Sequence, residues 1–231
     1  MIVHITRHGQ VHAISEGEET DVFFAPGDPP LSSLGRRQAW LLGKYLRKLG
    51  FAGEVYSSPY RRTTETGQII ADTADVPLCL APGMRESNGD GENMKKFRGL
   101  TAIELQTDYP RLRVDRDISY PWWTTDAEAA DDVEARVAPE IDLLMTRETD
   151  VLLVGHGASV GAATRHVLKR HAPELLERPR FPWNCMLTSM RLAPEFELLR
   201  LSSTDHLPDE AMTSNSKKRE QVLEILERAH K

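Results

Sequence analysis

The sequence has little cysteine and no long apolar run. Only Cys79 and Cys185 occur among its 231 residues, which excludes a disulfide framework or a cysteine-based zinc site and suits a reducing compartment. No stretch approaches the ~18 apolar residues of a membrane-spanning helix, and the N-terminus lacks the basic start and apolar run of an export signal. We therefore expect a cytoplasmic protein with no membrane partner.

Excess basic charge is also missing. The sequence has 29 Lys and Arg residues against 35 Asp and Glu residues, a net charge of −6. This balance argues against a broad basic surface that follows nucleic-acid phosphates, so we expect no nucleic-acid partner. The composition, 40% hydrophobic and 28% charged, is that of a globular protein. Any anion that binds must meet a local cluster of cations.

The order of the predicted elements indicates the fold class. Short apolar runs at 2–5, 53–57, 76–80, 150–155, 186–192 and 196–201 predict strands, of which the last two form an antiparallel pair. Helical spacing at 32–50, 58–70, 101–107, 128–145, 159–171 and 216–230 predicts helices. Alternation of the two predicts a three-layer α/β/α sandwich with a mainly parallel central sheet. Pro77 favours an edge position for the strand at 76–80.

The chain length fits one sizeable core. We expect residues 1–231 to form a single domain. The stretch at about 82–126 is rich in glycine, proline and charge, and we interpret it as an insertion or cap segment.

Three predicted strands end in residues that can carry chemistry. These stretches are Arg7-His8-Gly9, Ser57-Ser-Pro-Tyr-Arg-Arg62 and Gly155-His156-Gly157. Ligands of parallel α/β sheets bind beyond the carboxyl ends of the strands, so the three stretches belong to one crevice. If the first and fourth predicted strands are neighbours, His8 and His156 meet across it.

The other residues of these stretches indicate an anion site. Arg7 and Arg62 supply planar, two-pronged donors that match phosphate oxygens. Gly9 and Gly157 let the backbone approach an anion closely, and the N-termini of the following helices add partial positive charge. The pattern predicts a phosphate pocket that needs neither a metal ion nor a cofactor.

Four motifs carry a resemblance to a known family. They are Thr6-Arg7-His8-Gly9, Leu31-Ser-Ser-Leu-Gly35, Ser57-Ser-Pro-Tyr-Arg-Arg62 with Thr66, and Leu153-Val-Gly-His156-Gly157. Together, over residues 2 to about 168, they resemble the histidine phosphatase superfamily, which has the phosphoglycerate-mutase-like fold. The resemblance implies that His8 is the nucleophile and that Glu86 donates a proton. It also implies that Arg7, Arg62 and His156 bind the phosphate.

This chemistry is that of a metal-independent phosphomonoesterase with a phosphohistidine intermediate. A neutral imidazole attacks phosphorus, the arginines and the second histidine take up charge on the phosphate oxygens, and a carboxylic acid protonates the leaving oxygen. We expect a small phosphorylated substrate and a monomer or homodimer.

A mutase with the same site is the first alternative. Gln10 fits the pattern of the best-known branches, but Val11 and Ile14 stand where those branches carry Ser or Thr and then Asn. The insertion that holds a second phosphate is not recognisable between Glu86 and Glu128. These departures favour the phosphatase branch.

The segment between Glu86 and Glu128, where that insertion would stand, leaves two interpretations open. Lys95, Lys96 and Arg98 either meet an acidic substrate or form a solvated charged turn. Trp122 and Trp123 either stack on the leaving group or form a packed aromatic corner.

Three further alternatives remain. Ser159 lies in a G-x-S-x-G pattern between a predicted strand and helix, which is typical of serine hydrolases; its partners would be Asp205 with His206 or His230. A metal hydrolase on His4, His8 and His12 is disfavoured, because i, i+4 spacing brings ligands together on a helix and not on a strand. The last is an inactive phosphate-binding scaffold.

Overall fold

The computed structural model describes residues 1–11, 28–88 and 97–214. The helix predicted at 216–230 lies outside the described residues, as do Ile14, Lys95 and Lys96. No helix within the described ranges is both long and apolar enough to cross a membrane.

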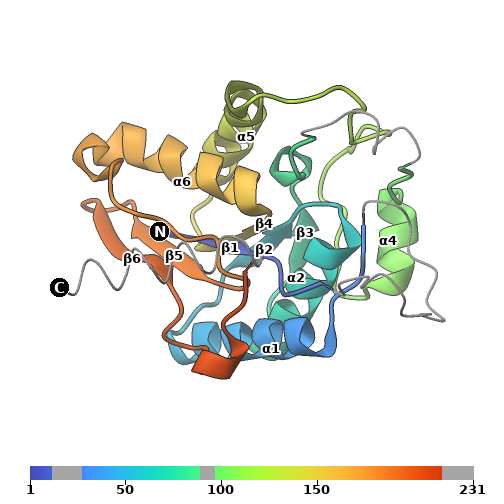
Figure 1. Cartoon of the computed structure of the whole chain (residues 1–231), viewed down its shortest axis with the longest axis horizontal. Helices are drawn as coiled ribbons and strands as arrows, with labels where there is room; N and C mark the ends of the chain where they lie inside the picture. The colour runs from blue at the N-terminus through green and yellow to red at the C-terminus, as the bar shows by residue number, and fades with distance from the viewer. Residues whose placement is uncertain (12–27, 89–96, 215–231) are drawn as a thin grey trace.

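A six-stranded sheet in the order β3-β2-β4-β1-β5-β6 forms the centre of the molecule (Figure 1). The strands are β1 (Ile2–Arg7), β2 (Glu54–Ser57), β3 (Leu78–Leu80), β4 (Val151–Gly155), β5 (Leu187–Arg191) and β6 (Glu197–Ser203). Strands β3, β2, β4 and β1 are parallel, and β5 is antiparallel to both of its neighbours. The predicted mainly parallel sheet is confirmed, and the strand that contains Leu78 lies at the sheet edge as expected.

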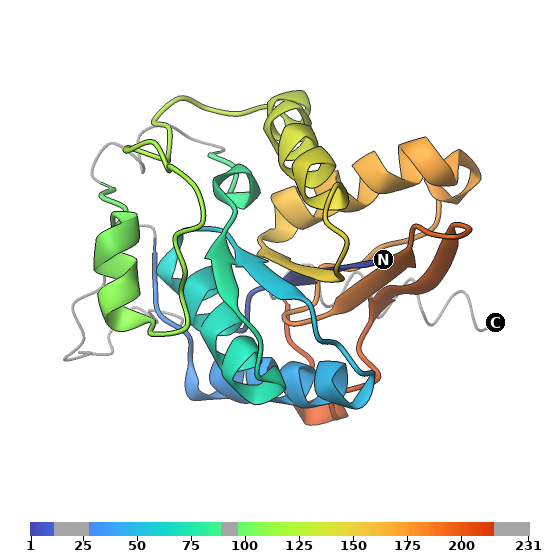
Figure 2. The same cartoon turned by 180° about the vertical axis from the view of Figure 1, so that it is seen from behind.

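Helices cover both faces of this sheet. The described helices are α1 (Ser33–Lys48), α2 (Arg61–Ala74), α4 (Ala102–Asp108), α5 (Ala130–Met145) and α6 (Gly157–His171), and all but α4 lie on a face. Figures 1 and 2 show α1 and α2 on one face and α5 and α6 on the other. In β4, Leu152 and Val154 belong to the core cluster that contains α1 and α2, whereas Val151 and Leu153 belong to the cluster that contains α5 and α6. The apolar β4 run is therefore buried on both faces, which produces the predicted three layers.

Several elements begin or end at residues other than those predicted. Strand β1 continues to Arg7, because Thr6 and Arg7 pair with Val154 and Gly155 of β4. Helix α6 begins at Gly157 and not at Ser159; Ser159 lies in its first turn, where its hydroxyl accepts a hydrogen bond from the N–H of His156 (3.0 Å). Partner strands and caps, which are not visible in local periodicity, set these boundaries.

The strand register places three residues at one edge. Arg7 pairs with Gly155, and Ser57 pairs with Val154, so β1, β4 and β2 end at nearly the same level. The next residues along the chain are His8, His156 and Ser58. The N–H of His8 donates to the carbonyl oxygen of Gly155 (3.0 Å), and the N–H of Ser58 donates to that of Val154 (3.0 Å). These hydrogen bonds fix the backbone that directly follows β1 and β2.

Gly9 keeps α1 close to this edge. A Cβ atom at Gly9 would lie 2.5 Å from the carbonyl oxygen of Gly35 in the first turn of α1. The sequence predicted that Gly9 serves the approach of an anion, but the described contact is between two backbone segments. Any larger residue would push the helix away from the loop that follows His8.

The segment between β3 and α5 packs against the sheet edge. It contains the short helical turn η1 (Pro82–Met84) and helix α4. Leu112 forms a parallel bridge to Leu78 of β3, and Leu105 of α4 is fully buried. Figure 2 shows α4 beside the β3 edge. The described part of this segment is thus anchored through apolar contacts.

Candidate active site

The His8 side chain is held in one tautomer. Its Nδ1 lies 2.7 Å from the carbonyl oxygen of Gly9, an acceptor that requires Nδ1 to carry the proton. The backbone oxygen of His8 accepts a hydrogen bond from Asn184 Nδ2 (2.9 Å). In the neutral ring, this leaves the lone pair on Nε2, the nitrogen that can act as a nucleophile.

Burial keeps this ring neutral. Desolvation, with smaller contributions from the charges of Arg62 and Arg7, lowers the pKa of His8 well below 6.5. Burial and the neighbouring cations lower the pKa of His156 in the same direction. A protonated imidazole has no free lone pair, so the surroundings of His8 preserve the form in which the ring can act as a nucleophile.

We expect the His8 ring of the free protein to remain neutral as the pH falls from 7 to about 6. Because the pKa of His8 is below 6.5, we expect kcat/KM to decrease only at pH values below 6.5. This holds after correction for the substrate's own ionisation near pH 6. The unfolded chain then binds more protons than the folded chain below pH 6.5, so acidification lowers the free energy of unfolding.

The measurement is an NMR titration of the His8 ring, assigned with His8→Ala. In Arg62→Met the pKa of His8 should rise but stay below 6.5, because burial is the larger cause of the shift. Protonation of His8 at or above pH 6.5 in the unaltered protein would contradict this interpretation of the site.

The second histidine lies against the first. The ring centroids of His8 and His156 are 5.3 Å apart, and His156 is fully buried. Its Nε2 lies 3.0 Å from Ser58 Oγ. Its Nδ1 lies 3.6 Å from Glu86 Oε2 and makes no hydrogen bond to any described residue. The predicted neighbours β1 and β4 thus bring the two imidazoles together.

Glu86 reaches this pocket from the loop after η1. One oxygen of its carboxylate faces His156 at 3.6 Å, and the other accepts a hydrogen bond from the N–H of Ser87 (2.9 Å). The side chain is about one-third exposed, at 32%. A carboxylate that borders both solvent and a buried imidazole can exchange protons with water and with a group bound beside that imidazole.

Arg7 contributes positive charge to the same pocket. Its Nη1 donates to the carbonyl oxygen of Pro182 (2.7 Å), and its buried Nε makes no hydrogen bond to a described residue. Burial lowers the pKa of Arg7, the negative charge of Glu86 raises it, and the positive charge of Arg62 lowers it. The charges of Glu86 and Arg62 therefore both act on the Arg7 guanidinium.

Asp28 is a site residue that the sequence analysis missed. Its carboxylate accepts hydrogen bonds from Arg62 Nη1 (3.0 Å) and from the N–H of Arg61 (2.7 Å), at the start of α2. The Arg62 guanidinium also lies 4.3 Å from the Tyr60 ring. Asp28 therefore both caps a helix and orients an arginine of the site. A short polar residue before Leu31-Ser-Ser-Leu-Gly35 was the available signal, but its partner lies far along the chain.

Tyr60 begins an aromatic cluster beside the pocket. Its ring packs edge-on against His156, with centroids 4.9 Å apart, and it contacts Phe97 and Trp122. Trp122 is buried and its Nε1 donates to Leu100 (2.8 Å). Of the two interpretations of Trp122 and Trp123, these contacts favour the packed aromatic corner. Burial raises the pKa of Tyr60 to about 12.

The described ion pair of Arg98 is not with a residue of the pocket. Its exposed guanidinium pairs with Glu104 at 3.1 Å. That contact matches the solvated charged turn, the second interpretation of the 95–98 stretch.

Ser159 is used as a cap. Its hydroxyl accepts from the N–H of His156 and lies 3.4 Å from the carbonyl oxygen of the same residue. His206, one of the two bases considered for a serine hydrolase, is 2.8 Å from the carbonyl of Cys185. The other, His230, lies outside the described residues. Among the described residues no imidazole nitrogen hydrogen-bonds to Ser159, so the geometry does not support this alternative.

The described residues contain no group of three or more His, Cys, Asp or Glu side chains placed to hold a metal ion. His4 lies 2.8 Å from Ser189 Oγ and packs edge-on against Phe51. His12 lies outside the described residues.

Two imidazoles and two arginines at the carboxyl edge of a parallel sheet make an α/β protein suited to phosphate esters. The model of the histidine phosphatase superfamily (branch 1) matches residues 3–204, and the chain belongs to this family. It is 29% identical over 151 residues to glucosyl-3-phosphoglycerate phosphatase of Mycolicibacterium vanbaalenii, a match that covers 61% of this chain and 64% of the relative, which is less than two thirds of its length. It is 26% identical to a probable phosphoglycerate mutase of Citrobacter koseri, with 91% of this chain and 96% of the relative covered.

Solved structures share the fold. Ecdysone phosphate phosphatase from Bombix mori, in complex with tungstate, has a TM-score of 0.70 at 20% identity, with 93% of this chain and 96% of that chain covered. Mycobacterial glucosyl-3-phosphoglycerate phosphatase with inorganic phosphate has a TM-score of 0.58 at 20% identity, with 90% and 99% covered. At these identities the structures establish the fold, which is that of histidine phosphatases.

Proposed function

We propose that the protein is a metal-independent phosphomonoesterase that acts through a phosphohistidine on His8. The observation that carries the proposal is the neutral His8 ring, whose Nδ1 is committed to the Gly9 carbonyl and whose Nε2 is therefore nucleophilic. His156 packs against this ring and the charges of Arg7 and Arg62 act on it, which supports a role for all three in binding the non-bridging oxygens of a phosphate.

The first chemical step transfers the phosphoryl group to the enzyme. Nε2 of His8 forms a bond to phosphorus while the bond from phosphorus to the alcohol oxygen breaks. Glu86, as the carboxylic acid, gives its proton to the departing oxygen. The N-terminus of α6 at Gly157 adds N–H groups that favour the negative charge of the phosphate.

The second step restores the enzyme. Glu86, now a carboxylate, takes a proton from a water molecule whose oxygen bonds to phosphorus. The phosphorus–nitrogen bond breaks, inorganic phosphate leaves, and His8 returns to its neutral form with the lone pair on Nε2. One carboxyl group thus serves as acid and then as base.

We further propose that residues 1–231 act as one domain in which the 82–126 segment contributes to recognition of the alcohol. Its described part contains Glu86, bridges to β3 through Leu112, and packs Phe97 and Trp122 against Tyr60. The phosphates named in the related proteins differ: ecdysone phosphate in one, glucosyl-3-phosphoglycerate in another. These names support a phosphomonoester substrate. They do not identify the alcohol, which has to be inferred from the residues of this chain.

The mutase is the second candidate, because one set of relatives carries that name. Val11, in place of the Ser or Thr of the best-known branches, and the structural neighbours named as phosphatases both favour hydrolysis.

The test is inorganic phosphate release from alkyl and aryl phosphates in the presence of a chelator. We expect full activity in chelator, inhibition by vanadate and negligible exchange between 2- and 3-phosphoglycerate. Activity that disappears with chelator and returns with a divalent ion would contradict the metal-independent mechanism. Rapid phosphoglycerate exchange would instead establish the mutase.

A further inference from the structure

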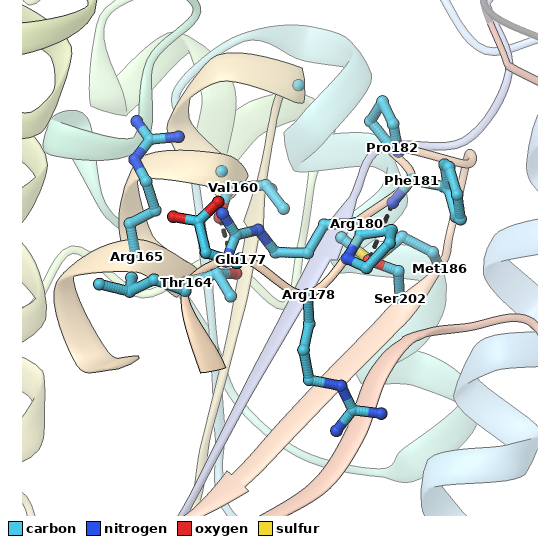
Figure 3. Close-up of a pocket in the computed structure, with 14 residues that line it drawn as sticks. Val160, Thr164, Arg165, Glu177, Arg178, Arg180, Phe181, Pro182, Met186 and Ser202 are labelled. Atoms are coloured by element: carbon cyan, nitrogen blue, oxygen red, sulfur yellow. Dashed lines mark hydrogen bonds between the residues drawn. The ribbon is translucent and has the colours of Figure 1, made fainter. Parts of the chain in front are cut away.

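A second cavity lies beside the phosphate pocket. It has a volume of about 420 Å³ and is lined by the N-terminal half of α6 and by residues 176–182, together with Met186 and Ser202 (Figure 3). None of the catalytic groups proposed above lines it except Gly157. The cavity is therefore a separate feature that the hydrolysis mechanism does not use.

Two residues connect this cavity to the phosphate pocket. Gly157 directly follows His156 and lines the cavity, and a Cβ atom at Gly157 would meet nothing within 4 Å. Pro182 also lines the cavity, and its carbonyl oxygen accepts the hydrogen bond of Arg7 Nη1. A molecule with its phosphate at His8 can extend past Gly157 without meeting a side chain at that position.

The cavity is positively charged. Arg165, Arg178 and Arg180 line it, against one carboxylate, Glu177. Only Arg165 has a described ion pair near by, with Glu134 at 3.6 Å. The first turn of α6 contains no acidic residue, so the partial positive charge of the helix N-terminus adds to that of the arginines.

Arg180 is the centre of this charge. Figure 3 shows its side chain reaching toward α6 and Val160, whereas Arg178 extends away from it. Its Nη1 is shielded from solvent and makes no hydrogen bond to a described residue. Burial, followed by the charge of Arg165, lowers the pKa of Arg180. A buried guanidinium donor without an acceptor is unusual, and an anionic group in the cavity would supply the acceptor.

Gly161 keeps the cavity open on the α6 side. A Cβ atom there would lie 3.5 Å from Arg165 Nη1, so the absence of a side chain leaves room between the helix and the arginines. The lining also includes the apolar side chains of Met186 and Phe181. The space thus combines cationic and apolar side chains, which suits an acid carried on a carbon chain.

We propose that this cavity binds a second acidic group, carried by the alcohol part of the phosphomonoester substrate. The inference rests on the proposed function, because the phosphate must sit at His8 for the alcohol to reach Arg180. The acidic group can be a carboxylate or a second phosphate, since both offer anionic oxygens to a guanidinium. The experiment distinguishes the two.

The substrates are three series of alkyl phosphates with increasing chain length, ending in a carboxylate, an uncharged amide or a second phosphate. At the best length we expect kcat/KM for the carboxylate or the bisphosphate to exceed that for the amide by about 10-fold or more, mainly through KM. The better of the two anions identifies the group. Nitrophenyl phosphate, which has no second acid, reports the phosphate site alone.

Two variants probe the cavity by different means. Arg180→Met removes the charge, and Gly161→Leu fills the space while it improves helix propensity. Each should reduce the anion preference to less than about 3-fold and change kcat/KM for nitrophenyl phosphate by less than about 2-fold. Arg170→Gln is the matched control. It removes a charge in the last turn of α6, where Arg170 pairs with Asp142 of α5 at 3.4 Å, and it should keep the preference for an anionic end.

The inference is overturned if the unaltered enzyme shows no preference for an anionic end at any chain length, or if the preference survives both variants. Hydrolysis of nitrophenyl phosphate by the unaltered enzyme with no anion preference would reject the cavity while supporting the phosphatase. Absence of hydrolysis for every substrate would reject the proposed function itself.

Discussion

Substitution of His8 by alanine should lower kcat/KM for every phosphomonoester by roughly 10⁴- to 10⁶-fold, because removal of a nucleophile abolishes the whole covalent pathway. Arg7, Arg62 and His156 would still bind the phosphate, so KM should change far less than kcat. Inorganic phosphate release, followed to long times at high enzyme concentration, measures the residual rate.

The covalent intermediate gives an independent measurement. Brief incubation with radiolabelled substrate, quenched in base, should leave a base-stable and acid-labile label on the unaltered protein and none on His8→Ala. His166→Ala is a suitable control, since that ring pairs with Asp142 at 2.8 Å on the outside of α6. Label that survives in His8→Ala, or that maps to Ser159, would refute the assignment of the nucleophile.

The second large effect is expected for Glu86→Gln, and its size should depend on the leaving group. General acid catalysis contributes about 10²–10⁴-fold where the leaving oxygen is basic. We therefore expect a loss of that order with an alkyl phosphate and a loss of less than about 10-fold with nitrophenyl phosphate, whose leaving oxygen needs little protonation. Paired kcat/KM measurements on the two substrates test this.

Glu104→Gln, which changes a carboxylate of α4 that pairs with Arg98, should leave both rates unchanged. Equal losses on the two substrates in Glu86→Gln would mean that Glu86 is not the proton donor. Its 3.6 Å contact with His156 would then be read as a positioning contact.

The central layers of the fold were predictable because their signal is local. The β4 run Val151–Gly155 is continuously apolar, and only a strand covered on both faces buries such a run. The N-cap of α1 was also visible: Ser32 accepts from the N–H of Gly35, at 3.0 Å. The exact end of β1 was not, because its last two residues are strand only through pairing with β4.

The site residues also separate into those with a local sequence signal and those that depend on distant contacts. His8, His156 and Arg62 each stand at a strand end or helix start that the sequence marks, so their common edge followed from the parallel sheet. Asp28 did not follow, since its role depends on a hydrogen bond to Arg62, 34 residues away. The cavity at Arg180 depends on how residues 176–182 lie beside α6, and no periodicity describes such a placement.

The level ends of β1, β4 and β2 have an evolutionary consequence. In the proposed mechanism the positions of His8 and His156 are set by backbone pairing within the sheet, and the residues proposed to surround the alcohol come from connections outside it. Drift in those connections can exchange one alcohol for another while the reacting atoms stay in register. Such a separation is consistent with a fold shared by proteins only 20–22% identical to this chain, whose names refer to ecdysone phosphate and to phosphoserine.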